Sequence, residues 1–263
     1  MICDDGGRLA NSVGECRRGD CALPAERKKT KEELRMGKAI FVTGTGTDIG
    51  KTYVTGLIVK KLRDAGMNAG YYKAAISGAE KGEHGELIAG DAMHVNRVAN
   101  IGETQENLVS YVYLEAVSPH LAARMNKNEI DFDRVEADFR RAVEKYDYLT
   151  MEGSGGIICP LRWDNEHHVI IDDLVKRLGL SCLIVADAGL GTINSAVLTI
   201  EHLRAREIPI KGVILNNFHE GDIMEEDNRL MIEEITGVPV IATVAGGDSE
   251  LDIDVEKLKN LYE

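Results

Sequence analysis

The chain has 263 residues, is 44% apolar and carries 44 acidic against 31 basic side chains, a net charge of −13. This length and apolar content suit one large globular domain, and the negative field disfavours nucleic acid and anionic membrane surfaces as partners. No apolar run approaches the roughly 20 residues of a membrane span and the N-terminus lacks the order of a secretory signal, so a cytoplasmic location is expected.

The first part of the chain is polar, irregular and rich in charge. Residues 1–35 precede the first strand-like run, and a second methionine, Met36, stands directly before that run. We therefore expect a flexible N-terminal extension over 1–35 and a single domain over 36–263. Three of the five cysteines lie in the extension, and no Cys or His spacing suits zinc, so reduced thiols are expected.

From Lys38 onward, short apolar runs alternate with longer amphipathic segments. Strands are expected over 38–43, 69–74, 146–152, 181–187, 210–217 and 238–244. Helices are expected at about 51–65, 91–100, 132–144, 172–178, 194–206 and 224–236. Runs with apolar residues at nearly every position are typical of strands buried on both faces of a parallel sheet. The pattern predicts a single-domain α/β fold, a mostly parallel sheet with helices on both faces.

A glycine-rich segment joins the first predicted strand to the first predicted helix. Glycines there let backbone N–H groups face phosphate oxygens, Lys51 supplies charge to the terminal phosphates, and the Thr52 hydroxyl can bind Mg²⁺. Gly44 and Gly50 are separated by five residues where the usual P-loop has four, so this is a variant loop in a P-loop NTPase-like fold. The expected nucleotide contacts are Gly46, Thr47, Asp48, Ile49, Gly50, Lys51 and Thr52.

The end of a later strand bears on which nucleotide is bound. A guanine-specific protein is expected to carry Asn-Lys-x-Asp there, but this strand ends Leu215-Asn216-Asn217-Phe218. ATP is therefore the expected nucleotide. Asn216 either faces the base or simply ends the strand.

Three acidic residues could serve a phosphate-bridging Mg²⁺, which usually takes one or two carboxylates. Glu152 ends a predicted strand and opens the glycine-rich segment 152–156 at the carboxyl edge of the sheet, where ligands of open α/β folds collect. Asp91 begins a predicted helix and could equally be a capping residue. Asp187 ends another strand and would be the useful acid in a switch ATPase.

Lys73 closes the second predicted strand, at the same edge of the sheet as the phosphate loop. A lysine at a strand end is usually solvated surface. Opposite a transferring phosphoryl group, however, its ammonium would stabilise the charge that develops. Local spacing leaves both interpretations open.

Six ordered segments together resemble dethiobiotin synthetases: VTGTGTDIGKT, YYKAAISG, GDA, VSPHLAA, MEGSGG and GTINSAVLT. The resemblance implies an ATP- and Mg²⁺-dependent ligase domain that converts 7,8-diaminononanoate and CO₂ into dethiobiotin, ADP and phosphate in biotin biosynthesis. By position it implies Lys51 and Lys73 as catalytic cations and Thr52, Asp91 and Glu152 as Mg²⁺ ligands. It also implies substrate contacts at Ser77, Gly153 and Gly155, and adenine beside Asn216.

The resemblance further implies a homodimer with the diamine near the subunit interface. The helix start at Thr192, Ile193 and Asn194 would receive the carboxylate of substrate held by the other subunit, a use of helix N-terminal N–H groups. Ala74 stands where family members often have proline, and residues 1–35 have no counterpart. His120, in VSPHLAA, is a weak candidate for shaping the site.

Two other functions use a similar loop. The ATPase half of a glutamine-dependent amidotransferase needs an additional glutaminase domain, for which residues 245–263 leave no room. A dimeric switch ATPase commonly has a second lysine near the first glycine of the loop, and residues 45–49 contain none. Both are therefore disfavoured.

Overall fold

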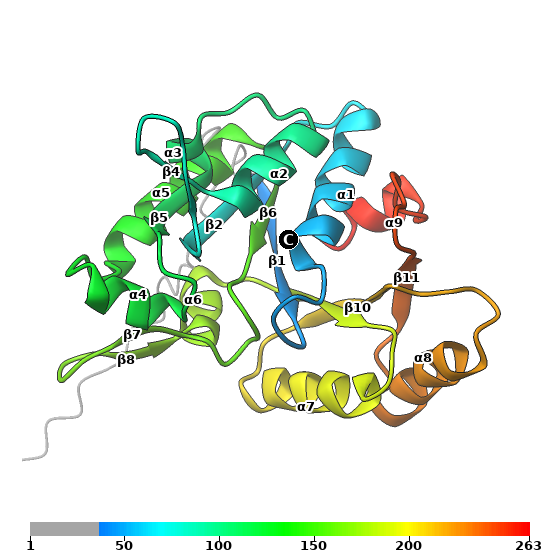
Figure 1. Cartoon of the computed structure of the whole chain (residues 1–263). Coiled ribbons are helices and arrows are strands. Elements are labelled where there is room, and N and C mark those ends of the chain that lie inside the picture. The colour runs from blue at the N-terminus through cyan, green and yellow to red at the C-terminus, as the bar shows by residue number, and fades with distance from the viewer. Residues whose placement is uncertain (1–36) are drawn as a thin grey trace, which may run out of the picture. The chain divides into compact units, whose positions relative to one another are not determined.

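A central parallel sheet organises the chain, as the computed structural model in Figure 1 shows for residues 37–263. Its seven strands lie in the order β11-β10-β9-β1-β6-β2-β5. They are β1 Lys38–Gly44, β2 Ala69–Ser77, β5 Val109–Tyr113, β6 Tyr148–Glu152, β9 Cys182–Asp187, β10 Ile210–Asn216 and β11 Val240–Val244. Two short antiparallel pairs accompany the sheet: β3 Glu80–Lys81 with β4 Leu87–Ile88, and β7 Pro160–Trp163 with β8 His168–Ile170. The extension predicted over 1–35 lies outside the described residues.

Helices connect the strands. They are α1 Lys51–Asp64, α2 Gly90–Val98, α3 Gln105–Leu108, α4 Pro119–Met125, α5 Phe132–Lys145, α6 Ile171–Leu178, α7 Thr192–Ala205, α8 Ile223–Thr236 and α9 Val255–Lys259. Right-handed crossovers in this strand order put α1 and α2 on one face of the sheet and α5 to α8 on the other. Helix α9 packs against α1. The predicted α/β fold with a parallel sheet and helices on both faces is confirmed.

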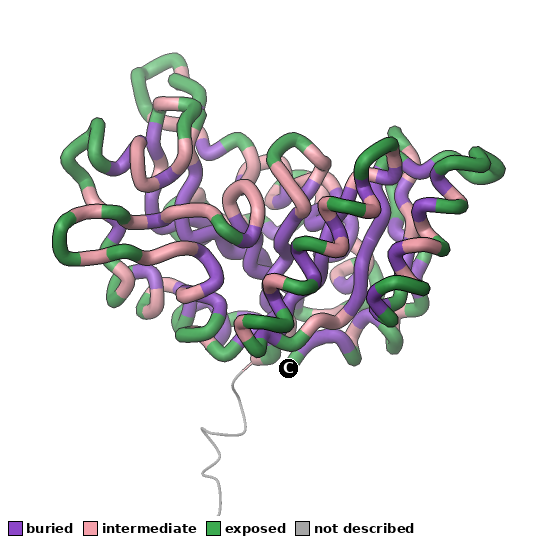
Figure 2. Tube along the Cα trace, turned by 90° about the horizontal axis from the view of Figure 1, so that it is seen from below, coloured by how far each residue is buried: buried purple, intermediate pink, exposed green. Residues whose placement is uncertain are grey.

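The strands form the core because both of their faces are covered. Ile40, Phe41 and Val42 of β1 are fully buried, as are Leu183 and Ile184 of β9. Figure 2 shows the same pattern, with buried segments gathered toward the centre and exposed ones at the outside. Burial of each such side chain contributes about 1.5–3 kcal/mol to the free energy of folding. The sheet therefore holds the loops at its edge in fixed positions.

Helix starts differ in a way that bears on function. Helices α5 and α8 begin with a side-chain cap, because Asp131 and Asp222 accept hydrogen bonds from backbone N–H groups of the first turn. Helices α1 and α7 instead follow left-handed glycines, Gly50 at φ 87° and Gly191 at φ 91°, with no side-chain cap and no acid in the first turn. The uncapped N–H groups of these two helices are open to an anionic ligand.

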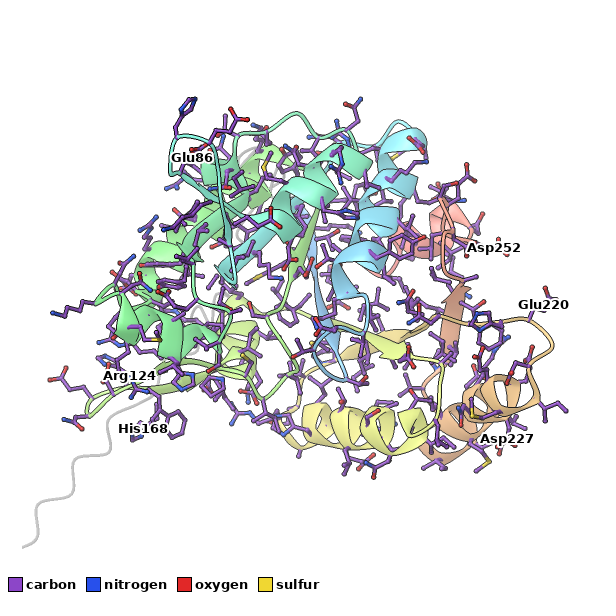
Figure 3. The ribbon with its side chains drawn as sticks, viewed as in Figure 1. Glu86, Arg124, His168, Glu220, Asp227 and Asp252 are labelled. Atoms are coloured by element: carbon purple, nitrogen blue, oxygen red, sulfur yellow. The ribbon has the colours of Figure 1, made fainter. Side chains whose placement is uncertain are left out.

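Charged side chains cover the outside. Glu86, Glu220, Asp227 and Asp252 are exposed and lie at the periphery in Figure 3. None of the helices within residues 37–263 combines the length and apolarity needed to cross a membrane.

Candidate active site

The parallel register brings the predicted groups to one edge of the sheet. Lys73 of β2 lies opposite Glu152 of β6, which in turn lies opposite Val42 near the end of β1. All three strands run in the same direction, so the loops that follow them emerge together. The phosphate loop after β1 therefore stands beside Lys73 and Glu152.

Asn216 of β10 supports the phosphate loop from behind. Its Nδ2 donates to the carbonyl of Ile49 at 3.0 Å. A Cβ added to Gly50 would lie 2.1 Å from the same nitrogen, and Gly50 also has φ +87°, so only glycine fits this turn. The Oδ1 of Asn216 is buried with no hydrogen-bond partner among the described residues. It is a free acceptor beside the loop.

Lys51 is held inside the loop that it belongs to. Its Nζ donates to the carbonyl of Gly46 at 2.6 Å, and the residue is only 7% exposed. Burial, and to a smaller extent repulsion from Lys73, lower the pKa of the Lys51 ammonium. Nearby carboxylates, Glu152 first among them, act to raise this pKa but do not outweigh the burial. The loop thus carries a poorly solvated cation that an anion would stabilise.

A compact cluster of charges lies next to the loop. Lys73 Nζ donates to Asp91 Oδ2 at 2.6 Å and to Glu152 Oε1 at 2.7 Å. Thr52 Oγ1 donates to the same Glu152 oxygen at 2.8 Å, and the Tyr71 hydroxyl donates to Oε2 at 3.2 Å. Glu152 and Lys73 are both almost completely buried. Two carboxylates, two hydroxyls and one ammonium therefore form a single network.

The protonation of this network follows from its contacts. Burial alone would lower the pKa of Lys73, but Glu152 and Asp91 outweigh it and the pKa is raised. Burial would raise the pKa of Asp91, but Lys73 and hydrogen bonds outweigh it and the pKa is lowered. Burial and the nearby Glu152 raise the pKa of Tyr71 well above its usual value. Lys73 and Asp91 are accordingly an ion pair at neutral pH.

These residues surround a cavity of about 610 Å³. The predicted residues that line it are Thr47, Asp48, Gly50, Lys51, Thr52, Lys73, Ser77, Asp91, Glu152 and Gly155. The lining also includes residues that sequence reasoning missed: Tyr53, Ile76, His94 and Ser154. The spacing of Asp91 and His94, three apart on one helix, could have pointed to His94.

Other predicted residues lie outside the cavity lining. Gly46, Ile49 and Asn216 belong to the loop and its support, as described above. Gly153 packs against the core, where a Cβ would lie 2.7 Å from the Phe41 ring. Thr192, Ile193 and Asn194 form the start of α7.

Two weaker candidates take other places. Asp187 accepts hydrogen bonds from Asn217 Nδ2 at 2.7 Å and from the N–H of Gly189 at 3.0 Å, so it stabilises the turn after β9. His120, near the start of α4, does not line the cavity, and its Nδ1 is buried without a partner in the described part of the chain.

The predicted Mg²⁺ ligands fit that ion in chemistry. Thr52, Asp91 and Glu152 supply hard oxygen donors, and Mg²⁺ typically takes one or two carboxylates together with phosphate oxygens and water. Across residues 37–263, no three or more His, Cys, Asp or Glu side chains are arranged as a metal site of their own. This donor set suits an ion that arrives with a nucleotide.

Comparisons with known proteins agree with this geometry. Residues 38–246 match the model of a family described as AAA domain. The chain is 47% identical over 228 residues to the ATP-dependent dethiobiotin synthetase BioD of Brachyspira hyodysenteriae, covering 87% of this chain and 100% of the relative. The chain is also 47% identical over 228 residues to the ATP-dependent dethiobiotin synthetase BioD of Clostridium botulinum strain Langeland, covering 87% of this chain and 99% of that relative. Among solved structures, the MinC:MinD cell division complex of Aquifex aeolicus aligns with a TM-score of 0.50 at 16% identity, covering 85% of this chain and 86% of that one, which shows the fold alone. The chain belongs to the family of ATP-dependent dethiobiotin synthetases.

Proposed function

We propose that this chain closes the ureido ring of dethiobiotin in biotin biosynthesis, from 7,8-diaminononanoate, CO₂ and ATP, as an ATP-dependent carbon–nitrogen ligase. The observation that carries the proposal is the convergence of Lys51, Lys73, Asp91 and Glu152 around one cavity beside the phosphate loop, in a chain 47% identical to dethiobiotin synthetases. Two cations and two carboxylates at a nucleotide loop suit phosphoryl transfer.

The nucleotide would lie along the loop and the start of α1. Residues 46–52 would surround the phosphates with backbone N–H groups, and Lys51 would exchange the carbonyl of Gly46 for a phosphate oxygen. The free Oδ1 of Asn216 could accept a hydrogen bond from the adenine amino group. An acceptor at this position favours adenine, because guanine carries a carbonyl oxygen there.

Thr52, Asp91 and Glu152 would hold Mg²⁺ beside the phosphates. When bound, Mg²⁺ would neutralise negative charge on the phosphate oxygens. Lys73 now lies between Asp91 and Glu152. Its flexible side chain would turn toward the reacting groups, where its charge is needed.

The chemistry needs no nucleophile from the protein. One substrate amine adds to CO₂ and loses a proton to give a carbamate. A carbamate oxygen attacks the γ-phosphorus of ATP and releases ADP. The second amine then attacks the carbonyl carbon of the mixed anhydride and expels phosphate, which closes the ring. Lys73 would stabilise the carbamate and the transferring phosphoryl group, while the loop and Lys51 hold the nucleotide in line.

A homodimer would complete the substrate site. The start of α7 is uncapped, as the binding of a substrate carboxylate requires. Leu190, just before α7, is 91% exposed, and Ile158 in the loop after Glu152 is 60% exposed. An exposed apolar side chain beside an open helix start, as at Leu190, favours a subunit interface there. Ser77 and Gly155 line the cavity and would contact the diamine, and Gly153 would shape the loop after β6 that carries Gly155.

The proposal also covers the location of the enzyme and the bounds of its ligase domain. We place the enzyme in the cytoplasm, where ATP is available, and the ligase domain at residues 36–263. The family match over residues 38–246 supports a domain that begins near Met36.

The direct test is an assay of the purified protein for ADP release and for dethiobiotin by mass spectrometry. ADP release should require both the diamine and bicarbonate, and one dethiobiotin should form per ADP. ATP hydrolysis that ignores the diamine and rises only with an added protein partner would contradict the ligase and favour a switch ATPase.

A further inference from the structure

Strand β2 presents two tyrosines in succession to opposite faces of the sheet. Successive side chains of a strand alternate between faces, so Tyr71 shares a face with Lys73, and Tyr72 points the other way. In the register with β6, Tyr71 lies opposite Thr150 and Lys73 lies opposite Glu152. Tyr71 therefore lies two residues before Lys73 along β2, farther from the carboxyl edge of the sheet, and on the same face as Lys73.

The two oxygens of the Glu152 carboxylate have different partners. Oε1 accepts from Lys73 Nζ and from Thr52 Oγ1, both groups of the active site. Oε2 accepts from the Tyr71 hydroxyl at 3.2 Å, and this is its single donor within the described part of the chain. Tyr71 and the Glu152 side chain are both fully buried, so water does not replace that donor.

A planar carboxylate fixed at one oxygen is also fixed at the other. Rotation about the last side-chain bond of Glu152 would exchange or tilt the two oxygens, because the torsion next to a carboxylate is broad and roughly two-fold. The hydroxyl of Tyr71 opposes that rotation. Oε1 therefore stays directed at Thr52 and the cavity, where the metal of the proposed function would bind.

We infer that Tyr71 is a positioning residue, which orients the Glu152 carboxylate for Mg²⁺ through a hydrogen bond to Oε2; the inference rests on the proposed metal site. Tyr71 does not touch substrate or metal and does not line the cavity. Partners behind a metal ligand commonly account for 10- to 100-fold in metal affinity. A substitution that removes only this hydroxyl should act on the metal before it acts on the nucleotide.

Tyr72 offers a matched control. It is 1% exposed, and its hydroxyl pairs with Ser110 Oγ at 2.7 Å and donates to the carbonyl of Val135 at 3.1 Å. Tyr72→Phe thus removes a buried hydroxyl from the same strand, next to Tyr71, but on the face away from Glu152. Loss of stability without loss of metal affinity is the expected result for this variant.

The experiment measures Mn²⁺ binding by electron paramagnetic resonance in the presence of ADP, for the full chain and both variants. Tyr71→Phe should raise the Kd for Mn²⁺ about tenfold while the Kd for ADP without metal stays within twofold. Tyr72→Phe should keep both constants within twofold, with thermal unfolding showing that each variant is folded. The apparent KM for Mg²⁺ in the ligase assay should rise for Tyr71→Phe, and saturating Mg²⁺ should restore most of kcat.

Three outcomes would overturn the inference. An unchanged Mn²⁺ affinity in Tyr71→Phe removes the positioning role and leaves the proposed function intact. An equal loss in Tyr72→Phe shows that any buried hydroxyl of β2 has this effect through stability. A wild-type protein that binds no Mn²⁺ beside ADP refutes the proposed metal site itself, and the role of Tyr71 with it.

Discussion

The ammonium of Lys73 is almost completely buried and lies 2.7 Å from Oε1 of Glu152 and 2.6 Å from Oδ2 of Asp91. One cation thus holds together the two carboxylates that are proposed to bind Mg²⁺. Without this ammonium, the buried carboxylate of Glu152 and the partly exposed carboxylate of Asp91 would repel each other. In the proposed reaction, Lys73 would therefore hold the two metal ligands in place before the nucleotide binds and would supply charge during phosphoryl transfer.

Removing the charge of Lys73 should reduce turnover more than nucleotide binding. We predict that Lys73→Gln lowers kcat about 10²- to 10³-fold, because the charge that stabilises the transferring phosphoryl group is lost. The Kd for ADP should change less than about fivefold, since Lys51 and the loop bind the phosphates. Steady-state assays and calorimetric ADP titrations measure the two effects.

Lys60→Gln is the control for this prediction. Lys60 pairs with Asp64 on the surface of α1, the helix that follows the phosphate loop. A surface pair of this kind contributes at most about 1 kcal/mol. Lys60→Gln should keep wild-type turnover, and near-normal turnover of Lys73→Gln itself would refute the catalytic role of Lys73.

A substitution at Gly50 should separate steric fit from backbone strain. Alanine at this position would put a Cβ 2.1 Å from Asn216 Nδ2 and require φ +87°. Gly66 has a similar φ of +79°, but a Cβ there meets nothing within 4 Å. We predict that Gly66→Ala costs about 1–2 kcal/mol of folding free energy and leaves ADP affinity unchanged. Gly50→Ala should cost more and weaken ADP binding at least tenfold, as urea unfolding and ADP titration would measure. Equal effects of the two substitutions on ADP affinity would show that the contact with Asn216 is unimportant.

Sequence patterns located most of this architecture because parallel strands carry local signals. The runs at 38–43 and 181–187 are apolar at nearly every position, and they became β1 and β9. Strand β5, at 109–113, was missed. It has five residues, two of them polar or half-buried, and lies at the edge of the sheet, where β2 is its one neighbour. Its edge position is not the reason, because β11 is the other edge strand, has the same burial pattern and was predicted. The difference is that Ser110 interrupts the short apolar run of β5 near its start, which weakens the pattern.

The sequence predicted those site residues whose position depends on the pattern of one strand alone. Glu152 closes β6 as predicted, but the prediction that Lys73 closes its strand was wrong, because β2 continues to Ser77. Both residues were still predicted near the carboxyl edge of one parallel sheet, so their approach was implicit in the sequence. The contact between Tyr71 and Glu152 was not, because it depends on which strands are neighbours. Strands β2 and β6 are adjacent in the sheet although seven of the other eighteen described elements lie between them along the chain. Pairing of that kind is a property of the packed fold, and local spacing carries no signal for it.

An acidic residue at Leu190 should expose the role of the second subunit. Leu190 is 91% exposed, immediately before the uncapped start of α7. We predict that Leu190→Glu converts the proposed dimer to monomer in sedimentation velocity. It should raise the KM for the diamine at least tenfold, because negative charge then repels the substrate carboxylate. ADP affinity should stay normal, since the loop is intact within each chain.

Leu230→Glu is the matched control, on α8 and 53% exposed. It introduces the same charge away from the start of α7, so assembly and diamine KM should stay as in the wild type. A wild-type chain that sediments as a monomer and still makes dethiobiotin would refute the shared substrate site.

His219 should make stability depend on pH in a defined direction. Its Nδ1 lies 3.0 Å from Glu225 Oε1, and this hydrogen bond, together with the charge of Glu225, raises the pKa of His219 above its usual 6.5. A raised folded-state pKa means that the proton is bound more tightly in the folded state. The stabilisation is therefore complete below the unfolded pKa and is lost as pH rises through the folded pKa. The His219 ring is largely exposed, so solvent screens the pair and the effect should be small.

Thermal unfolding between pH 5.5 and 8.5 would measure this effect on stability, with His219→Asn as comparison. The wild type should exceed the variant in Tm at pH 5.5, and the difference should shrink toward pH 8.5. A difference that is constant, or that grows with pH, would mean that His219 does not take up its proton preferentially in the folded protein.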